Sequence, residues 1–404
     1  MDSTSTAVCY GLRVMMFVSK IAGCPFVNGV CGRRECKKSR LCWLISGPFG
    51  LAYSVICIAL CSCVGLVYVA TVLWLNGRTD QITFITRSGL YFVVYGQVVL
   101  NICNLLLRRK QLADIVVTAT KLEPSLRLDM KSVRRRLQKV TLLCLLYTLI
   151  DAFKYVVGRR GQIKVAFYLF RGYGDHVKRL FVPCYIASCF LVSTWYNMVF
   201  WQIVYFSSLF REYFAALSDR LESEMANESR AESKGLSSES VRLNLVELQK
   251  LLRKVNAFVG VQALWYYCGS VFFLCAMLYY NTATSNVGVA ENASNWSYVV
   301  VMAAGVVFST AAASSMTHEA SRIHSIIQAS KFETLSDAAT HRLHILILTV
   351  EDLQGSLTGC GMFVINLPLI VTIVGSVITY TVVLVQTSES IMSNKCSRGP
   401  VVLK

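Results

Sequence analysis

The chain has 404 residues, of which 54% are apolar and only 16% are charged, and its mean hydropathy is +0.51. This composition excludes a set of soluble domains, because so much apolar surface needs a solvent other than water. Sixteen cysteines are too few for a disulfide scaffold. The net charge of +17 would suit a nucleic-acid-binding protein, but the basic residues lie between apolar blocks rather than in a binding motif. We therefore expect a membrane protein without a nucleic-acid partner.

Seven apolar stretches are long enough to cross a bilayer, which takes about 20 residues for a core of roughly 30 Å. They predict an all-α membrane protein with seven transmembrane helices at residues 47–75, 82–107, 140–157, 180–210, 255–280, 296–315 and 360–386. An earlier segment, Ala7 to Val30, is interrupted by charged residues, Gly and Pro. We expect it to form an amphipathic helix at the membrane interface.

The distribution of Lys and Arg between the two sets of loops predicts the orientation. Twenty-eight basic residues lie on the side of the N-terminus and ten on the opposite side. This asymmetry places the N-terminus in the cytoplasm and, with seven spans, the C-terminus outside. One predicted outer loop, Gly158 to Arg179, does not fit this orientation, because it carries six basic residues. Either it is tolerated because earlier segments set the orientation, or it attracts an anionic ligand or lipid.

Glycosylation, metal and cofactor signals are weak. The sequons at Asn292 and Asn295 fall in the predicted third outer loop, where glycosylation is possible, but a third at Asn227 falls on the predicted cytoplasmic side. The pair His341 and His344 has no definite partner ligands, so we expect no metal site. No P-loop, G-x-S-x-G or H-E-x-x-H motif is present, so we expect neither an enzyme nor a cofactor.

Two common classes of membrane protein fit the pattern poorly. A G-protein-coupled receptor places its N-terminus outside, and neither D-R-Y nor N-P-x-x-Y is found at the expected helix ends. A transporter built from repeats usually has a pair of Gly- or Pro-broken helices in corresponding halves, which this sequence lacks.

The last predicted span contains Thr379 and Tyr380, then five residues, then Gln386. This spacing resembles the TYhhhhhQF signature of arthropod gustatory receptors, which share the inverted topology. Two positions depart from the family pattern. Thr387 replaces the final Phe, and Thr381 stands where sugar-sensing members commonly carry Glu, which disfavours a sweet receptor.

The resemblance implies a ligand-gated, nonselective cation channel of the plasma membrane, opened by a small organic tastant. It also implies a homo- or hetero-tetramer in which each subunit contributes its last helix to a central pore. Helical spacing predicts that the pore and gate use Val377, Thr381 and Val385, capped by Gln386. Alternatively, this stripe packs against lipid or other helices, and the Ser and Thr hydroxyls bond to carbonyls four residues earlier. A non-conducting inverted receptor and a small-solute transporter stay open as alternatives.

The domain organisation follows from the spans and from the resemblance. Apolar residues at helical spacing in 211–254 and 316–359 predict amphipathic helices that resemble the family's intracellular anchor; the alternative is a helix lying on anionic lipid. The predicted segments are a cytoplasmic N-terminus (1–46), four spans (47–210), an anchor segment (211–254), two spans (255–315), a second anchor segment (316–359), the pore helix (360–386) and an extracellular tail (387–404).

Charged and aromatic residues in the outer half of the spans are candidates for a ligand site, because intramembrane charges are uncommon and aromatic walls suit a small organic ligand. The predicted ligand-binding residues are Arg87, Tyr91, Tyr95, Asp151, Tyr155, Trp195 and Tyr266. Asp151 is expected to pair with Arg87, or locally with Lys154 one turn away. The alternative is a purely structural ion pair.

Overall fold

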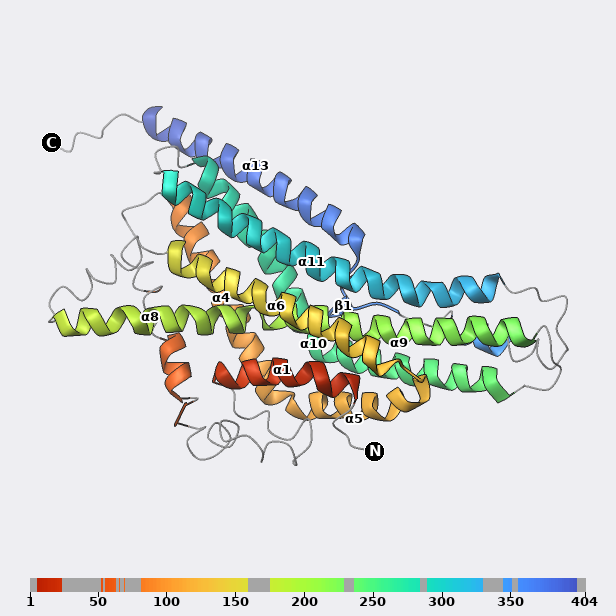
Figure 1. Cartoon of the computed structure of the whole chain (residues 1–404). Coiled ribbons are helices and arrows are strands. Elements are labelled where there is room, and N and C mark those ends of the chain that lie inside the picture. Colours follow the sequence, from red (N-terminus) through yellow and green to blue (C-terminus); the bar gives the residue numbers. More distant parts are fainter. Residues whose placement is uncertain are drawn as a thin grey trace, which may run out of the picture.

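The computed structural model describes residues 6–23, 52, 53, 55–62, 65, 69, 81–158, 175–228, 236–283, 289–329, 344–350 and 355–397. Over these residues the protein is a bundle of long helices with one short hairpin, which confirms the predicted all-α membrane fold (Figure 1). Its elements are α1 (Ala7–Ile21), α4 (Gln81–Leu107), α5 (Arg109–Leu126), α6 (Met130–Gly158), α8 (Asp175–Tyr196), α9 (Met198–Glu228), α10 (Leu236–Ala283), α11 (Val289–Gln328), β1 (Thr358–Gly359), β2 (Phe363–Val364) and α13 (Leu367–Ser397).

Most of the predicted spans coincide with these helices. Four stretches within the described residues are long and apolar enough to cross a membrane, and they lie in α4, α10, α11 and α13. The third predicted span forms the second half of α6. The first predicted span, 47–75, lies largely outside the described residues, and its described positions are helical.

The fourth predicted span is not one helix. The helical pattern is interrupted at Asn197, so that α8 ends at Tyr196 and α9 begins at Met198. The side-chain amide of Asn101 on α4 lies in this break and donates to the carbonyl of Trp195 over 2.6 Å. A side chain that inserts beside the backbone ladder is a known cause of helix breaks. The predicted fourth span over 180–210 is thus divided into two successive helices, although Asn197 donates its backbone N–H to Ser193 and accepts that of Trp201 across the interruption.

The first helix is also placed differently from its prediction. Ala7, Val8 and Leu12 on α1 are fully buried, and the helix packs against α5, α6, α8 and α9. The indole N–H of Trp195 donates to the carbonyl of Ala22, just beyond the end of α1, over 2.8 Å. A helix that lies on the membrane interface keeps its polar face in solvent. Helix α1 is instead part of the packed bundle.

Three helices continue together well beyond their predicted spans. Figure 1 shows α9, α10 and α11 extending side by side at one end of the bundle, and α11 packs most extensively on α9. Arg322 on α11 joins the two helices because its guanidinium lies 3.0 Å from Asp219 and 2.8 Å from Glu222 on α9. These extensions overlap the predicted anchor segments 211–254 and 316–359, whose cytoplasmic location stays a prediction.

A two-stranded hairpin sets the start of the last helix. Strands β1 and β2 pair antiparallel, and the turn between them contains Cys360 and Gly361, both with positive φ. Asn256 on α10 donates to the carbonyl of Ser356 over 3.0 Å and accepts the N–H of Thr358 over 3.1 Å. The hairpin is thereby tied to α10. The last helix consequently begins at Leu367 rather than at residue 360, and it continues past residue 386 to Ser397.

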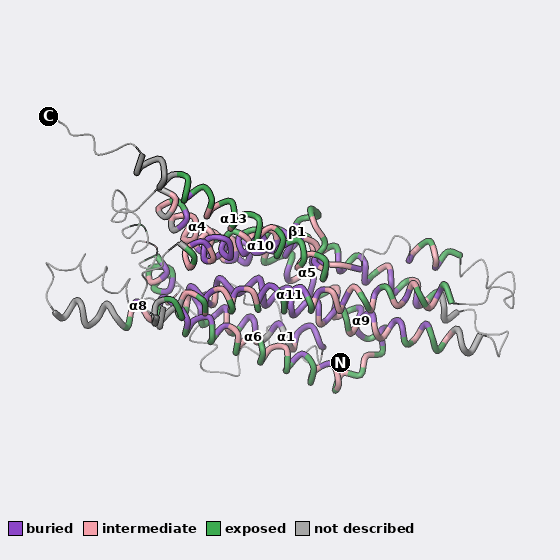
Figure 2. Tube along the Cα trace, turned by 90° about the horizontal axis from the view of Figure 1, so that it is seen from above, coloured by how far each residue is buried: buried purple, intermediate pink, exposed green. Residues whose placement is uncertain are grey.

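The distribution of burial separates the last helix from the others. Of the most apolar stretch of α13, 11% of residues are buried, compared with 61% for α10. In Figure 2, α13 lies at the edge of the bundle and is mostly exposed. Among the described residues, α13 is therefore packed against neighbours on one side and is exposed on the other.

Candidate functional site

A buried polar cluster surrounds Asp151 on α6. One carboxylate oxygen lies 2.6 Å from the ammonium of Lys154, one turn along the same helix. The other oxygen accepts the hydroxyl of Ser193 over 2.6 Å and the amide of Asn197 over 2.8 Å. Asp151 and Lys154 are 2% and 8% exposed. Burying an ion pair is costly unless further hydrogen bonds satisfy the lone pairs that the pair itself leaves open. Ser193 and Asn197 supply such hydrogen bonds to the Asp151 carboxylate.

The ammonium of Lys154 is also covered by an aromatic ring. It lies 4.6 Å from the centre of the Tyr298 ring on α11, and the Tyr298 hydroxyl donates to the carbonyl of Lys154 over 3.3 Å. Asp151 therefore pairs locally with Lys154, which was the second of the two predicted pairings. The side chain of Arg87, the other predicted partner, lies outside the described residues.

Aromatic and small residues continue this cluster towards the middle of the bundle. The Tyr147 hydroxyl on α6 donates to the carbonyl of Val301 over 3.1 Å, and its ring centre lies 4.4 Å from that of Phe200. A side chain at Gly305 on α11 would collide with the Tyr147 hydroxyl and would meet the Tyr266 hydroxyl at 3.0 Å. Helices α6, α10 and α11 can approach each other here because position 305 has no Cβ.

Some buried polar atoms at the break between α8 and α9, and in the first turn of α9, have no hydrogen-bond partner among the described residues. They are the side-chain carbonyl oxygen of Asn197 and both amide atoms of Gln202 on α9. Both residues are fully buried. A buried amide group without a partner costs about 1–3 kcal/mol. Such groups are available to a water molecule or to a polar atom of a small ligand.

The remaining predicted ligand residues divide between other surroundings. Of the seven, Asp151 and Tyr266 lie in the cluster just described. Trp195 instead binds the end of α1 through its indole N–H. Tyr91 and Tyr95 on α4 are partly buried, and the Tyr95 hydroxyl donates to the carbonyl of Cys61 in the first predicted span. The side chain of Tyr155 lies outside the described residues.

The sequence prediction missed several members of the cluster. Ser193, Asn197, Tyr147, Tyr298 and Gly305 were not among the predicted site residues, although they surround Asp151 or Tyr266. One usable signal was present, because Ser193 and Asn197 are polar residues one helical turn apart in a predicted span. Polar groups at that depth are expensive unless they face protein or water.

One face of the last helix is occupied by α10. Val377 is 7% exposed, and its carbonyl accepts the thiol of Cys275 over 3.7 Å. Further along this face, the Ser388 hydroxyl accepts a hydrogen bond from the Tyr279 hydroxyl over 3.1 Å. Thr381 and Val385, two of the predicted pore residues, are partly buried. Val377 therefore packs against another helix, as the alternative interpretation of this stripe expected. Thr381 and Val385 do so in part.

The opposite face of the last helix carries the exposed polar residues. Gly375, Thr379 and Gln386 are exposed, and no atom lies within 4 Å of where a Cβ at Gly375 would be. Thr379 donates to the carbonyl of Gly375 over 2.9 Å, as the alternative interpretation of the hydroxyls expected. Tyr380 is 59% exposed. Of the predicted pore and motif residues, Gln386, Thr379 and Tyr380 are thus exposed within the described part of the chain.

The two sequons of the predicted outer loop lie in a helix instead. Asn292 and Asn295 both fall in the first turns of α11, which begins at Val289. Asn292 is exposed and Asn295 is partly buried. The loop prediction for these positions was wrong because α11 starts before the apolar stretch that marked its span.

Comparison with known proteins finds a matching family and similar solved structures. The family described as 7tm chemosensory receptor matches residues 12–391. Among solved structures, the insect olfactory receptor OR5 from Machilis hrabei in complex with eugenol is similar, with a TM-score of 0.71 and 12% identity over 94% of this chain and 98% of that one. A second structure of the same receptor gives a TM-score of 0.71 and 13% identity over 93% and 97%. No curated protein sequence is a significant match.

Proposed function

Because the chain belongs to the 7tm chemosensory receptor family, we propose that it is a gustatory receptor that acts as a ligand-gated, nonselective cation channel. A small organic tastant opens it, and it works in the plasma membrane with its N-terminus in the cytoplasm. The count of 28 basic residues against ten supports this orientation. The Thr379, Tyr380 and Gln386 spacing supports the gustatory branch.

The exposed polar face of α13 is the observation that carries the channel proposal. A helix this apolar belongs in a membrane, yet Thr379 and Gln386 lie on the side that no other part of the described chain covers. The Thr379 hydroxyl is satisfied within the helix by the Gly375 carbonyl, but the Gln386 amide facing lipid is costly, so this face favours contact with water or protein. Copies of α13 arranged around a common axis provide both. This argument favours an oligomer with Gly375, Thr379 and Gln386 facing the pore, and the resemblance to gustatory receptors favours a homo- or hetero-tetramer.

This arrangement revises the predicted gate. The predicted stripe ran through Val377, Thr381 and Val385, but Val377 packs against α10. Gln386 is the predicted pore residue that lies on the exposed face. It follows Thr379 by seven positions, about two helical turns, which places both on the same side of the helix. We propose that these two positions, rather than Val377, contact permeating ions.

The cluster around Asp151 is the proposed ligand site. It combines aromatic surface from Tyr147, Tyr266 and Tyr298 with the unpaired side-chain carbonyl oxygen of Asn197, whose NH₂ group binds Asp151. A few oriented polar groups within aromatic walls are typical of sites for small organic molecules. The similar structure of the Machilis hrabei receptor with eugenol supports a ligand of that size.

The test begins with a panel of small organic tastants applied to cells that express the full chain, with intracellular calcium as the readout. Any active compound is then applied to the purified protein in a planar bilayer. We expect agonist-evoked single-channel events carried by both Na⁺ and K⁺. Calcium responses in cells without any current from the purified protein would favour a non-conducting receptor. Stoichiometric uptake of the solute without channel events would favour a transporter.

A further inference from the structure

The hairpin that precedes the last helix is held along one face of α10. Asn256 makes two hydrogen bonds to the backbone at β1. One turn further along α10, a Cβ at Gly260 would lie only 3.0 Å from the backbone nitrogen of Cys360, so the turn of the hairpin rests directly on the helix. Two more turns along the same face bring Tyr267 into position beside the hairpin.

Tyr267 meets the hairpin through an aromatic contact. Its ring centre lies 5.7 Å from that of Phe363 on β2, and the two ring planes stand at 83°. An edge-to-face arrangement of this kind is favourable for two aromatic rings. The fully buried Ile365 follows in the chain and donates its N–H to the Leu357 carbonyl over 2.9 Å, and α13 begins at Leu367. Phe363 thus holds the strand that leads directly into the last helix.

The hydroxyl of Tyr267 reaches a third helix. It lies 3.1 Å from the Ser309 hydroxyl and 3.0 Å from the Thr310 hydroxyl on α11. Tyr267 is 2% exposed, so these hydrogen bonds are shielded from water. A single side chain of α10 therefore joins α11 to the hairpin.

The same part of α11 borders the proposed ligand site. Ser309 lies one turn after Gly305, where the absence of a Cβ leaves room for the Tyr147 and Tyr266 hydroxyls. The rings of Tyr266 and Tyr267 are also in contact, with centres 5.3 Å apart and planes at 80°. Tyr267 is therefore connected to the proposed ligand site in two ways, through α11 and through the neighbouring ring.

We propose that Tyr267 is a positioning residue, which transmits a change at the ligand site to the start of α13 through its contact with Phe363. The inference rests on the proposed function, because it takes the cluster around Asp151 as the ligand site and α13 as the pore helix. Cys275 and Tyr279 on α10 contact the middle and the later part of α13. The hairpin contact acts instead on its first turn.

The test replaces a ligand with a methyl group built into the site. Gly305→Ala places this group against the Tyr147 and Tyr266 hydroxyls. Hydrogen exchange followed by mass spectrometry then measures local opening of residues 355–375 in the purified full chain, in detergent and without an agonist. Coupling through packed side chains changes equilibria by roughly two- to thirtyfold. We therefore expect the hairpin and the first turns of α13 to exchange roughly threefold faster or more than in the wild type.

A substitution in the hairpin tests the route. Phe363→Leu removes the aromatic contact but keeps an apolar side chain, so the added effect of Gly305→Ala is expected to fall below about 1.5-fold in this background. The matched control Met362→Leu changes a neighbouring residue that is 74% exposed, and it is expected to keep the full effect. Equal effects in the two backgrounds would overturn the proposal, and so would an otherwise wild-type hairpin that does not respond to Gly305→Ala.

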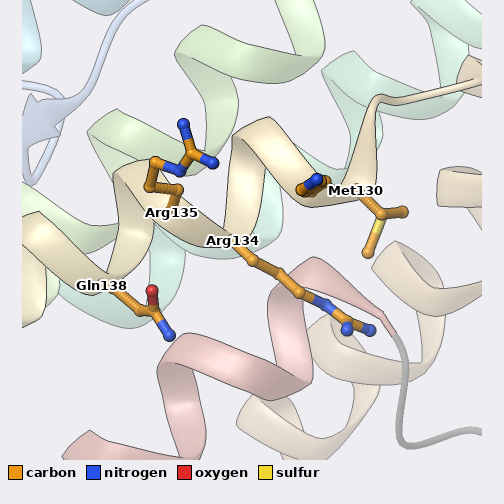
Figure 3. A pocket seen from close by; sticks show the side chains of 5 residues that line it. Met130, Arg134, Arg135 and Gln138 are labelled. Carbon is orange, nitrogen blue, oxygen red and sulfur yellow. The ribbon is translucent and has the colours of Figure 1, made fainter.

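The first turns of α6 provide an internal control for general loosening of the bundle. They form a pocket of about 530 Å³, whose lining residues all belong to α6 (Figure 3): Met130, Lys131, Arg134, Arg135 and Gln138. Arg134 there contacts Tyr10 on α1 rather than the hairpin. Exchange that rises as much over residues 130–138 as over 355–375 would show that Gly305→Ala loosens the whole bundle, and it would overturn a directed effect on the hairpin.

A second change at the site covers the case in which Gly305→Ala folds poorly. Tyr147→Phe removes the hydroxyl that the added methyl group would touch, which also donates to the Val301 carbonyl. We expect exchange over residues 355–375 to change by about twofold or more in this variant, and by less than that when Phe363→Leu is also present. An effect of Tyr147→Phe that is the same with and without Phe363→Leu would overturn the proposal.

The exchange experiment is independent of conduction. A hairpin response that depends on Phe363, in a protein that gives no agonist-evoked current, would contradict the proposed channel and leave the coupling standing. Agonist-evoked current in a protein whose hairpin ignores both changes at the site would do the reverse.

Discussion

The hydroxyl of Tyr213 on α9 donates to the carboxylate of Glu123 on α5 over 2.7 Å, and both side chains are buried. The same carboxylate accepts the backbone N–H groups of Ala7 and Val8 over 2.7 Å and 2.8 Å. These are amides of the first turn of α1, which have no partner within the helix and carry its positive dipole end. Glu123 thus fixes the start of α1 to two other helices.

Replacing Glu123 with Gln is expected to loosen α1. An amide retains one acceptor oxygen and turns an NH₂ group towards the backbone N–H groups that the second oxygen accepted. A buried donor left without a partner costs about 1–3 kcal/mol. Hydrogen exchange followed by mass spectrometry should show faster exchange across residues 7–21. The exposed Glu247→Gln variant is the control, and equal exchange in both variants would show that Glu123 does not hold α1.

The same residue predicts a pH dependence. Burial raises the pKa of Glu123 above its ordinary value of 4.5, although hydrogen bonds from Tyr213, Val8 and Ala7 oppose the shift. Because the folded protein then binds this proton more tightly than the unfolded chain, the stabilisation from protonation is complete below the unfolded pKa. It is lost as the pH rises through the folded pKa. In that window the thermal midpoint of the wild type should fall more steeply than that of Glu123→Gln, while Glu247→Gln keeps the wild-type slope.

The pair Asp151 and Lys154 allows a double-substitution test. Either Asp151→Asn or Lys154→Met leaves one buried charge without its partner, which is expected to cost roughly 3–5 kcal/mol of stability. The double variant removes both charges, and its loss is expected to be smaller than the sum of the two single losses. Thermal midpoints of the purified protein in detergent measure all three. Additive losses would mean that the two side chains do not interact, contrary to their 2.6 Å separation.

The sequence predicted the fold well where one helix is apolar over a long stretch. Helices α4, α10 and α11 contain their predicted spans because a run of apolar residues is sufficient evidence for a membrane helix. The break at Asn197 escaped prediction because it depends on Asn101, which lies almost a hundred residues earlier and reaches the Trp195 carbonyl only in the folded chain. The burial of α1 likewise depends on Glu123 and Trp195, which local periodicity does not reveal.

The candidate site was less predictable than the fold. Asp151 and Lys154 were identifiable because charges are uncommon in membrane spans. Their real partners, Ser193 and Tyr298, come from two other helices, and which face of each helix meets α6 is a tertiary property. For the last helix, spacing alone selected the stripe through Val377, and only the contact with α10 distinguishes this stripe from the exposed one.

Two glycines provide a steric comparison. Gly305→Ala places a methyl group against the Tyr147 and Tyr266 hydroxyls, and overpacking of this kind typically costs about 1–3 kcal/mol. Gly375→Ala meets nothing within 4 Å and lies in a helix, so its thermal midpoint should equal or exceed that of the wild type. Agonist dose-response curves should shift for Gly305→Ala if the cluster around Asp151 holds the ligand. If Gly305→Ala lowers the thermal midpoint but leaves agonist potency unchanged, Gly305 serves only the packing of the helices.

The last helix offers a test of which face lines the pore. Gln386→Ala and Thr379→Val alter the exposed face, and we expect them to change the relative permeability of Na⁺ and Ca²⁺ or the basal leak current. Val377→Ala alters the face packed on α10. It is expected to lower the free energy of unfolding by about 0.5–1.5 kcal/mol or more, seen as a lower thermal midpoint, without changing ion selectivity. Whole-cell recordings at matched surface expression compare the three. Because the packed face is held by Cys275 and Tyr279, it cannot turn towards a central axis without losing those contacts. A change of selectivity in Val377→Ala, with none in Gln386→Ala, would therefore require α13 to rotate in the open channel and would reject the proposed pore face.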